Sequence, residues 1–422
     1  MWKERINKLN FLVLCLLACF PVINTKVTVV LIISFTAISA LSGFVWGIKS
    51  IERKQVKELV LLLIPFGLIF FRTYITDRSD NALFYLEVSM SLLAFPAAFF
   101  LSPATYTQKQ KDVLSLMFVL STAAIILFGE IQAALQLAAD CGPGKFWPNR
   151  AAVFSDPAFT YHFRTIFEEQ TSIHPTYASI FLGISIILIL DYFLKSFHQR
   201  AIRSNAFILT VIILFIFLQS LLASRTPFIA TMFCSVVLIF IYLKRKIFAL
   251  YVLGGLIILS VLLIFMVPSF SSRFREISVS NTSVPSTTNE NSFNIRVGIY
   301  QCSRDVISEN WIWGVGPGNV QDKLNDCYAD ISKEVYDQKN YNTHNQFMDY
   351  WAGLGILGPV SLIIILLYTS IRNYRIKNPL ALCISLLFII AMMTENLLSR
   401  QNGIVCFAYF TSLYFFSPRR TF

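Results

Sequence analysis

Long, uninterrupted apolar runs constrain the fold of this chain more than any other feature. Twelve runs occur, at residues 9–24, 26–48, 57–76, 82–101, 112–138, 175–195, 205–223, 226–243, 246–268, 346–371, 378–398 and 402–417. Most approach the ~20 residues that an α-helix needs to cross a bilayer. In lipid, only helices and closed barrels satisfy their own backbone hydrogen bonds, and barrel strands alternate in polarity. The continuous runs therefore predict an all-α, polytopic transmembrane bundle of about twelve spans.

Composition and charge fit the same interpretation. Only 14% of the 422 residues are charged, whereas soluble globular proteins carry about 25%. The formal net charge of +11 would suggest a nucleic-acid partner in a soluble protein. In a membrane protein, basic residues in cytoplasmic connections fix the topology instead. We therefore expect membrane lipid, and no nucleic acid, as a partner.

The positions of the basic residues predict the orientation of the spans. These residues gather at both ends of the chain and in every second connection: Lys3, Arg5, Lys8; Arg53, Lys54; Lys109, Lys111; Lys195, Arg200, Arg203; Lys244, Arg245, Lys246; Arg372, Arg375, Lys377; Arg419, Arg420. The intervening connections lack this excess, as residues 77–80 illustrate. Because positive residues remain on the cytoplasmic side, we expect an even number of spans and cytoplasmic termini.

Two long polar segments then lie on the outer side, at residues 139–174 and 269–345. The chain divides into three parts: nine spans with the shorter outer segment (1–268), the partly helical large loop (269–345), and three spans with a basic tail (346–422). Cys302 and Cys327 both fall in the large loop. An oxidising outer compartment would permit a disulfide between them.

Two arginines stand out near the outer ends of predicted spans. Arg225 precedes Pro227, which suits the first turn of a helix, where backbone N–H groups favour anions. Taken alone, Arg225 could equally be a snorkelling residue in a tight turn. Arg296 and Tyr300 are spaced to share one helix face, although an isolated arginine would be an ordinary solvated residue. As a pair, Arg225 and Arg296 could bind a diphosphate through bidentate contacts.

A histidine and four ionisable residues complete the candidate site. His344 directly precedes an apolar run, and its neutral imidazole could take a proton from a sugar hydroxyl. A lone histidine at a helix start is more often structural. His174, Glu395, Arg400 and Arg72 also lie at outer ends of spans, where each could support the same site or form a structural ion pair. The spacing of Cys and His residues suggests no metal site.

At these residues the sequence resembles the O-antigen ligase and O-antigen polymerase superfamily of bacterial membrane glycosyltransferases. The matching pieces are Ser224-Arg225-Thr226-Pro227, Arg296 with Tyr300, Trp311 to Gly318, and His344-Asn345 followed by Trp351-Ala352-Gly353-Leu354-Gly355. They cover the C-terminal half of the chain, whereas the N-terminal half matches only by hydropathy. The resemblance implies a GT-C-like enzyme of the bacterial inner membrane, with a periplasmic active site and no metal or other cofactor.

The resemblance also implies roles for the candidate residues. Such enzymes take a glycan from undecaprenyl diphosphate and pass it to an acceptor hydroxyl, which belongs to lipid A-core in the ligases of lipopolysaccharide biosynthesis. Arg225 and Arg296 would bind the diphosphate, and His344 would act as the base or orient the acceptor.

Several alternatives remain open from the sequence. A polymerase of O-antigen or exopolysaccharide repeat units would use the same donor and a second lipid-linked glycan as acceptor. A further relative transfers glycans to protein serine or threonine. A polysaccharide or lipid transporter belongs to a different class, and it would require charged residues in the middle of spans and paired half-repeats, which the sequence lacks.

Overall fold

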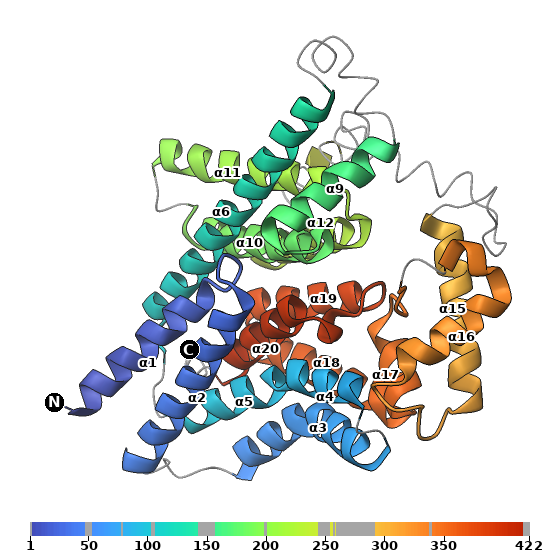
Figure 1. Ribbon diagram of the computed structural model, residues 1–422. Helices are drawn as coiled ribbons and strands as arrows, with labels where there is room; N and C mark the ends of the chain where they lie inside the picture. The colour runs from blue at the N-terminus through green and yellow to red at the C-terminus, as the bar shows by residue number, and fades with distance from the viewer. Residues whose placement is uncertain are drawn as a thin grey trace.

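The computed structural model describes residues 2–46, 53–76, 79–102, 106–141, 157–197, 201–243, 254–255, 258, 292–336 and 340–416. Every regular element within these ranges is helical (Figure 1). The helices are α1 (Trp2–Ala18), α2 (Thr25–Trp46), α3 (Arg53–Thr76), α4 (Asp80–Ser89), α5 (Ser91–Leu101), α6 (Gln108–Cys141), α9 (Pro157–Thr171), α10 (Pro175–Ser196), α11 (Ile202–Leu221), α12 (Arg225–Tyr242), α15 (Ser292–Glu309), α16 (Val320–Tyr336), α17 (Gln346–Leu354), α18 (Leu357–Arg375), α19 (Pro379–Met392), η2 (Leu397–Ser399) and α20 (Gln401–Phe415).

Eight segments in the described part are long and apolar enough to cross a membrane. They are α2, α3, α4 with α5, α6, α10, α11, α12 and α18. The helices α1, α19 and α20 overlap predicted runs but, at 17, 14 and 15 residues, are shorter than these eight segments. The predicted run 246–268 lies outside the described residues except for Gly254, Gly255 and Ile258. The prediction of an all-α, polytopic membrane protein is confirmed.

Two predicted spans are interrupted at the end of the bundle that carries the candidate site. The run 346–371 breaks at Gly355, whose φ of +69° is unfavourable for other residues. A Cβ atom there would lie 2.0 Å from the carbonyl oxygen of Ile312, so the break is also where another segment approaches closely. The run 378–398 stops being helical after Met392 and continues as a loop that contains Glu395.

Helix α10 lies at the centre of the bundle, in contact with α6, α11, α12 and α19 (Figure 1). Its side chains are buried without interruption from Pro175 to Leu188. Gly183 allows α12 to approach closely, because a Cβ atom there would lie 2.3 Å from Oγ1 of Thr231. Close packing through small residues is the usual way in which helices associate in lipid.

Helices α15 and α16 form a small unit against α17, separate from the main hydrophobic core (Figure 1). A disulfide joins Cys302 of α15 to Cys327 of α16, with 5.7 Å between their Cα atoms. The connection from α15 to α16 docks on α17 through Trp351, whose Nε1 donates to the carbonyl oxygen of Trp311 over 3.0 Å. This unit positions α15, and therefore Arg296, over the end of the bundle.

Candidate functional site

Glu395 joins two of the residues that the sequence singled out. One carboxylate oxygen lies 3.6 Å from Nη2 of Arg296, and the other lies 3.6 Å from Nδ1 of His344. The three residues come from different segments, namely α15, the turn before α17 and the loop between α19 and α20. The Glu395 side chain is only 11% exposed, so the ion pairs are partly shielded from solvent.

The electrostatics of this cluster keep Glu395 ionised. Burial alone raises the pKa of its carboxyl group, because it disfavours the charged form. The interaction with His344 and the positive charge of Arg296 outweigh burial and lower the pKa to about 2. A carboxylate in this position can fix the orientation of an imidazole and compensate the charge of a guanidinium.

His344 has a backbone conformation that few residues other than glycine adopt. Its φ is +46°, and such left-handed positions cost about 1–3 kcal/mol and cluster at functional sites. Its N–H donates to Oδ1 of Asn342 over 3.0 Å, and the Tyr300 hydroxyl donates to its carbonyl oxygen over 3.5 Å. Tyr300 therefore supports the backbone of His344, while Arg296, one turn earlier on α15, pairs with Glu395.

A buried polar network holds the Glu395 loop against the start of α17. Oδ1 of Asn396 accepts from Thr343 Oγ1 at 3.0 Å and from the N–H of Asn345 at 2.8 Å. Nδ2 of Asn396 donates to Oδ1 of Asp349 over 2.9 Å. The other oxygen of Asp349 accepts from Tyr85 and from Ser399. Because this network joins residues adjacent to His344 and to Glu395, it sets the distance between those two side chains.

A second ionic cluster lies beside the first, around Glu168 of α9. One oxygen of Glu168 is 4.0 Å from Nε2 of His174, and the other is 3.9 Å from Nη1 of Arg400. Burial raises the pKa of Glu168, and the charges of Arg400 and Arg164 lower it in part. Glu395 and His344 both influence the pKa of His174, so the two clusters belong to one electrostatic site.

His174 is held neutral in this cluster. Burial lowers its pKa to about 4, with a further contribution from the charge of Arg164. As the N-cap residue of α10, it accepts a hydrogen bond at Nδ1 from the N–H of Thr176, over 3.3 Å. Because Nδ1 accepts, the proton of the neutral ring resides on Nε2, which faces Glu168.

Arg225 opens α12 and is half-buried, with Pro227 in the first turn as the sequence predicted. The turn before it is held by Arg164 of α9, whose Nη1 donates to the carbonyl oxygen of Leu222 and, over 3.2 Å, to Oγ of Ser224. Arg164 also influences the pKa of both Glu168 and His174. Arg164 therefore connects the start of α12 to the second cluster.

Arg72 of α3 lies at the same end of the bundle but contacts neither ionic cluster among the described residues. Its Nη2 donates to the carbonyl oxygen of Gly314 over 2.9 Å, within the connection from α15 to α16. This hydrogen bond connects α3 to the α15–α16 unit. Within the described ranges, no hydrogen bond or ion pair joins Arg72 directly to Glu395 or Glu168.

Sequence reasoning did not single out Arg164, Glu168, Asp349 or Asn396. Asp349 carried a usable signal, because an ionisable residue inside an apolar run is expected to have a specific role. Arg164 and Glu168 carried none, since charged residues are ordinary in the polar segment 139–174. Among the residues that the structure describes, no three His, Cys, Asp or Glu side chains are grouped in a way that would hold a metal ion.

The helices and the two clusters define a multi-pass membrane protein with an ionic site at one end of its spans. The family model for O-antigen ligase matches residues 208–363, which contain Arg225, Arg296 and His344. This match confirms the resemblance to the O-antigen ligase superfamily over that segment, and it supports a function of the O-antigen ligase or polymerase type. No curated protein matched the chain.

Proposed function

We propose that this protein is an O-antigen ligase-type glycosyltransferase that moves a glycan from undecaprenyl diphosphate to a hydroxyl group of lipid A-core. The observation that carries the proposal is the bridge from Glu395 to both Arg296 and His344. A guanidinium and an imidazole thus lie on the two sides of one carboxylate, which supports anion binding by Arg296 and proton transfer by His344. This arrangement suits a donor that carries a diphosphate and an acceptor that must lose a proton.

In the proposed reaction, the acceptor hydroxyl oxygen forms a bond to the anomeric carbon of the glycan. The bond from that carbon to the diphosphate oxygen breaks, and undecaprenyl diphosphate leaves with the bonding electrons. The hydroxyl proton passes to Nε2 of His344, while Nδ1 faces Glu395. A general base of this kind contributes about 10²–10⁴-fold to the rate.

Arg296 and Arg225 hold the diphosphate in this proposal. Guanidinium groups retain their charge at any relevant pH, and they stabilise the negative charge that develops as the C–O bond breaks. Arg296 exchanges part of its contact with Glu395 for contact with the donor. Arg225 acts together with the N-terminal N–H groups of α12, where an anion is favoured. His174, Glu168 and Arg400 form the adjoining wall of the site.

We place this site on the periplasmic face of the bacterial inner membrane, with both termini in the cytoplasm. The disulfide between Cys302 and Cys327 supports this orientation, because structural disulfides persist in oxidising compartments. The basic connections would then lie on the cytoplasmic face, in agreement with the positive-inside rule.

The transporter alternative gains little support from Glu130, a buried acid within a candidate span. Glu130 of α6 is buried, and its carboxylate oxygens have no hydrogen-bond partner in the described part of the chain. It lies about 33 Å along α6 from Gln108, at 1.5 Å per residue. It neighbours Gly129, which packs on Phe167 and Thr171 of α9. Glu130 therefore lies near the site end of the bundle rather than at mid-membrane.

The test is the lipopolysaccharide profile of a deletion strain complemented with variants. Arg225→Ala, Arg296→Ala and His344→Ala should abolish glycan transfer at normal protein level. Arg304→Ala and His162→Ala are matched controls, because their side chains are 74% and 55% exposed and lie outside the clusters. A ligase mutant keeps long lipid-linked chains, whereas lipopolysaccharide with single repeat units attached would identify a polymerase. Full transfer by the three site variants would refute the proposed site.

A further inference from the structure

A large cavity lies at the end of the bundle opposite the candidate site. Its volume is about 1180 Å³, and residues of α6, α10, α11, α12, α18, α19 and α20 line it. Helix α10 shows that the cavity and the candidate site lie at opposite ends. It begins after His174 of the candidate site, and Asp191 and Lys195 near its other end line the cavity. Seventeen to twenty-one residues of helix span about 26–32 Å at 1.5 Å per residue, which is the thickness of a hydrocarbon core.

The lining of the cavity is amphipathic along the membrane axis. Its deep part is apolar: Val119, Leu120, Ala123, Leu188, Ile189, Val211 and Phe215. Its outer part consists of polar residues at helix ends: Gln108, Lys111, Asp112, Lys195, Ser196, Tyr242, Asn373, Lys377 and Asn378. Pockets for drug-sized molecules measure about 300–1,000 Å³, so this cavity accommodates a longer amphiphile.

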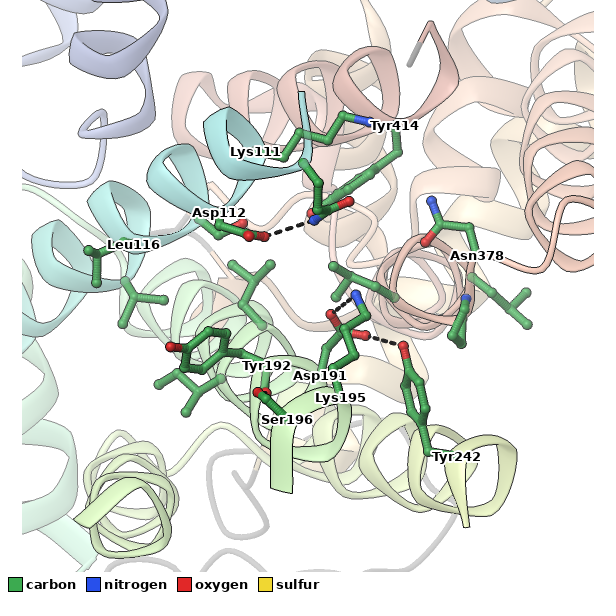
Figure 2. Close-up of a pocket in the computed structure, with 18 of the residues that line it drawn as sticks. Lys111, Asp112, Leu116, Asp191, Tyr192, Lys195, Ser196, Tyr242, Asn378 and Tyr414 are labelled. Carbon is green, nitrogen blue, oxygen red and sulfur yellow. Dashed lines mark hydrogen bonds and ion pairs between the residues drawn. The ribbon is translucent and has the colours of Figure 1, made fainter. Parts of the chain in front are cut away.

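Lysines outnumber aspartates in the polar part. Figure 2 shows Asp191 between Lys195 and Tyr242 on one wall, with hydrogen bonds to both. Asp112 accepts from Nε2 of Gln108 over 2.8 Å. Lys111, from the first turn of α6, and Lys377, from the connection between α18 and α19, add two more positive charges.

Two helix ends in the polar part favour a ligand with an anionic head. The first residues of α6 and α19 both line the cavity, and the N-terminal end of a helix favours negative charge.

We propose that the cavity binds one anionic phospholipid, of the phosphatidylglycerol kind. The phosphate lies near Lys111 and Lys377, and the acyl chains follow the apolar wall. Basic pockets between transmembrane helices are established sites for anionic lipid head groups. The lipid closes the bundle at the membrane face opposite the ionic clusters, independently of the reaction proposed there.

Native mass spectrometry of the full-length protein, purified and then mixed with defined lipid, tests this assignment. We expect one phosphatidylglycerol to remain bound under conditions that strip phosphatidylcholine. Each of Lys111→Gln and Lys377→Gln should weaken binding roughly fivefold, the effect of one lysine at an anionic surface. Lys109→Gln is the matched control, because Lys109 lies in the same helical turn, is exposed and does not line the cavity.

A second pair of variants tests the apolar wall. Val211→Trp should fill the deep part of the cavity and release the lipid while leaving the lysines in place. If the Val211→Trp variant does not fold, Ala123→Leu is the alternative, because it also reduces the volume of the deep part of the cavity. Equal retention of phosphatidylcholine, an unchanged affinity in the double lysine variant, or a co-purified polyprenyl phosphate in place of phospholipid would overturn the proposal.

Discussion

Nδ1 of His344 faces Oε2 of Glu395 across 3.6 Å, in a turn whose backbone is left-handed only at His344. The carboxylate is buried and ionised, so it favours a proton on the facing nitrogen of the ring. That leaves the other ring nitrogen as an acceptor. The separation is too long for a strong hydrogen bond, as is common at catalytic sites before substrate binds.

Glu395→Gln should therefore reduce glycan transfer while preserving the fold. The amide keeps the size of the side chain but removes the charge that orients His344 and compensates Arg296. We expect a loss of at least tenfold in kcat, within the roughly 10²–10⁴-fold that a general base supplies. Transfer to purified acceptor measures the loss. Glu309→Gln, an exposed change at the end of α15, is the control, and equal rates for both variants would contradict the assignment.

Acidification should destabilise the protein between pH 6.5 and about pH 4, because of His174. Its folded-state pKa is lowered to about 4, so over that interval the unfolded state binds a proton that the native state does not. The free energy of unfolding therefore decreases as the pH is lowered through this window. The loss reaches up to about 3 kcal/mol, at about 1.4 kcal/mol for each unit by which the pKa is lowered. Glu395, whose pKa is also lowered, loses its own contribution only at lower pH, between about 4.5 and 2.

His174→Asn isolates this effect, because asparagine can still cap α10 by accepting from Thr176. Thermal unfolding of the purified protein at pH 7, 6, 5 and 4 should show a flatter pH dependence for His174→Asn than for the wild type. His162→Asn, at an exposed histidine, should leave the slope as it is. An identical slope in His174→Asn would show that other groups cause the acid sensitivity.

The spans could be predicted from the sequence because hydropathy is a local property, but the convergence of the site could not. Arg296 and His344 are recognisable from their motifs, whereas their contact with Glu395 depends on how α15 packs over the loop after α19. The expected continuous helix 346–371 is broken because Gly355 meets Ile312, which is distant in the sequence. Similarly, Arg164 acts on the start of α12 from another helix, and no local pattern encodes such a contact.

Removing the disulfide should loosen the α15–α16 unit. The bond closes a loop of 25 residues, for which chain entropy predicts a stabilisation of roughly 3.5 kcal/mol. Because α15 carries Arg296, the Cys302→Ala/Cys327→Ala variant should show faster proteolysis within residues 292–336 and a higher KM for the donor. Reductant should produce the same changes in the wild type and none in the variant. Unchanged proteolysis in the variant would contradict this role.

Arg72 should behave as a structural residue rather than as a donor-binding one. Arg72→Met leaves the carbonyl oxygen of Gly314 without its partner, which costs about 1–3 kcal/mol. We expect a lower melting temperature and an almost unchanged KM for the lipid-linked donor. Arg296→Met should instead raise the KM for the lipid-linked donor and leave the melting temperature almost unchanged. An equal rise in KM for both variants, at equal stability, would place Arg72 in the binding site.

Asn396 offers a test of the network that positions Glu395. Asn396→Asp keeps the oxygen that accepts from Thr343 and Asn345, but it turns a second oxygen toward the carboxylate of Asp349. Two acceptors then face each other in a buried site, so we expect marked destabilisation and loss of transfer. Asp349→Asn alone should also destabilise, because either orientation of the new amide turns its NH2 group toward a donor, Nδ2 of Asn396 or Nε2 of Gln346.

The double variant Asn396→Asp/Asp349→Asn restores one donor and one acceptor with the direction of the hydrogen bond reversed. The remaining oxygen at position 349 can still accept from Tyr85 and Ser399. Melting temperature and transfer rate should therefore recover in part, with an interaction energy between the two positions of about 0.5–3 kcal/mol. Additive losses would show that the two residues act separately, and that the distance between His344 and Glu395 is set by other contacts.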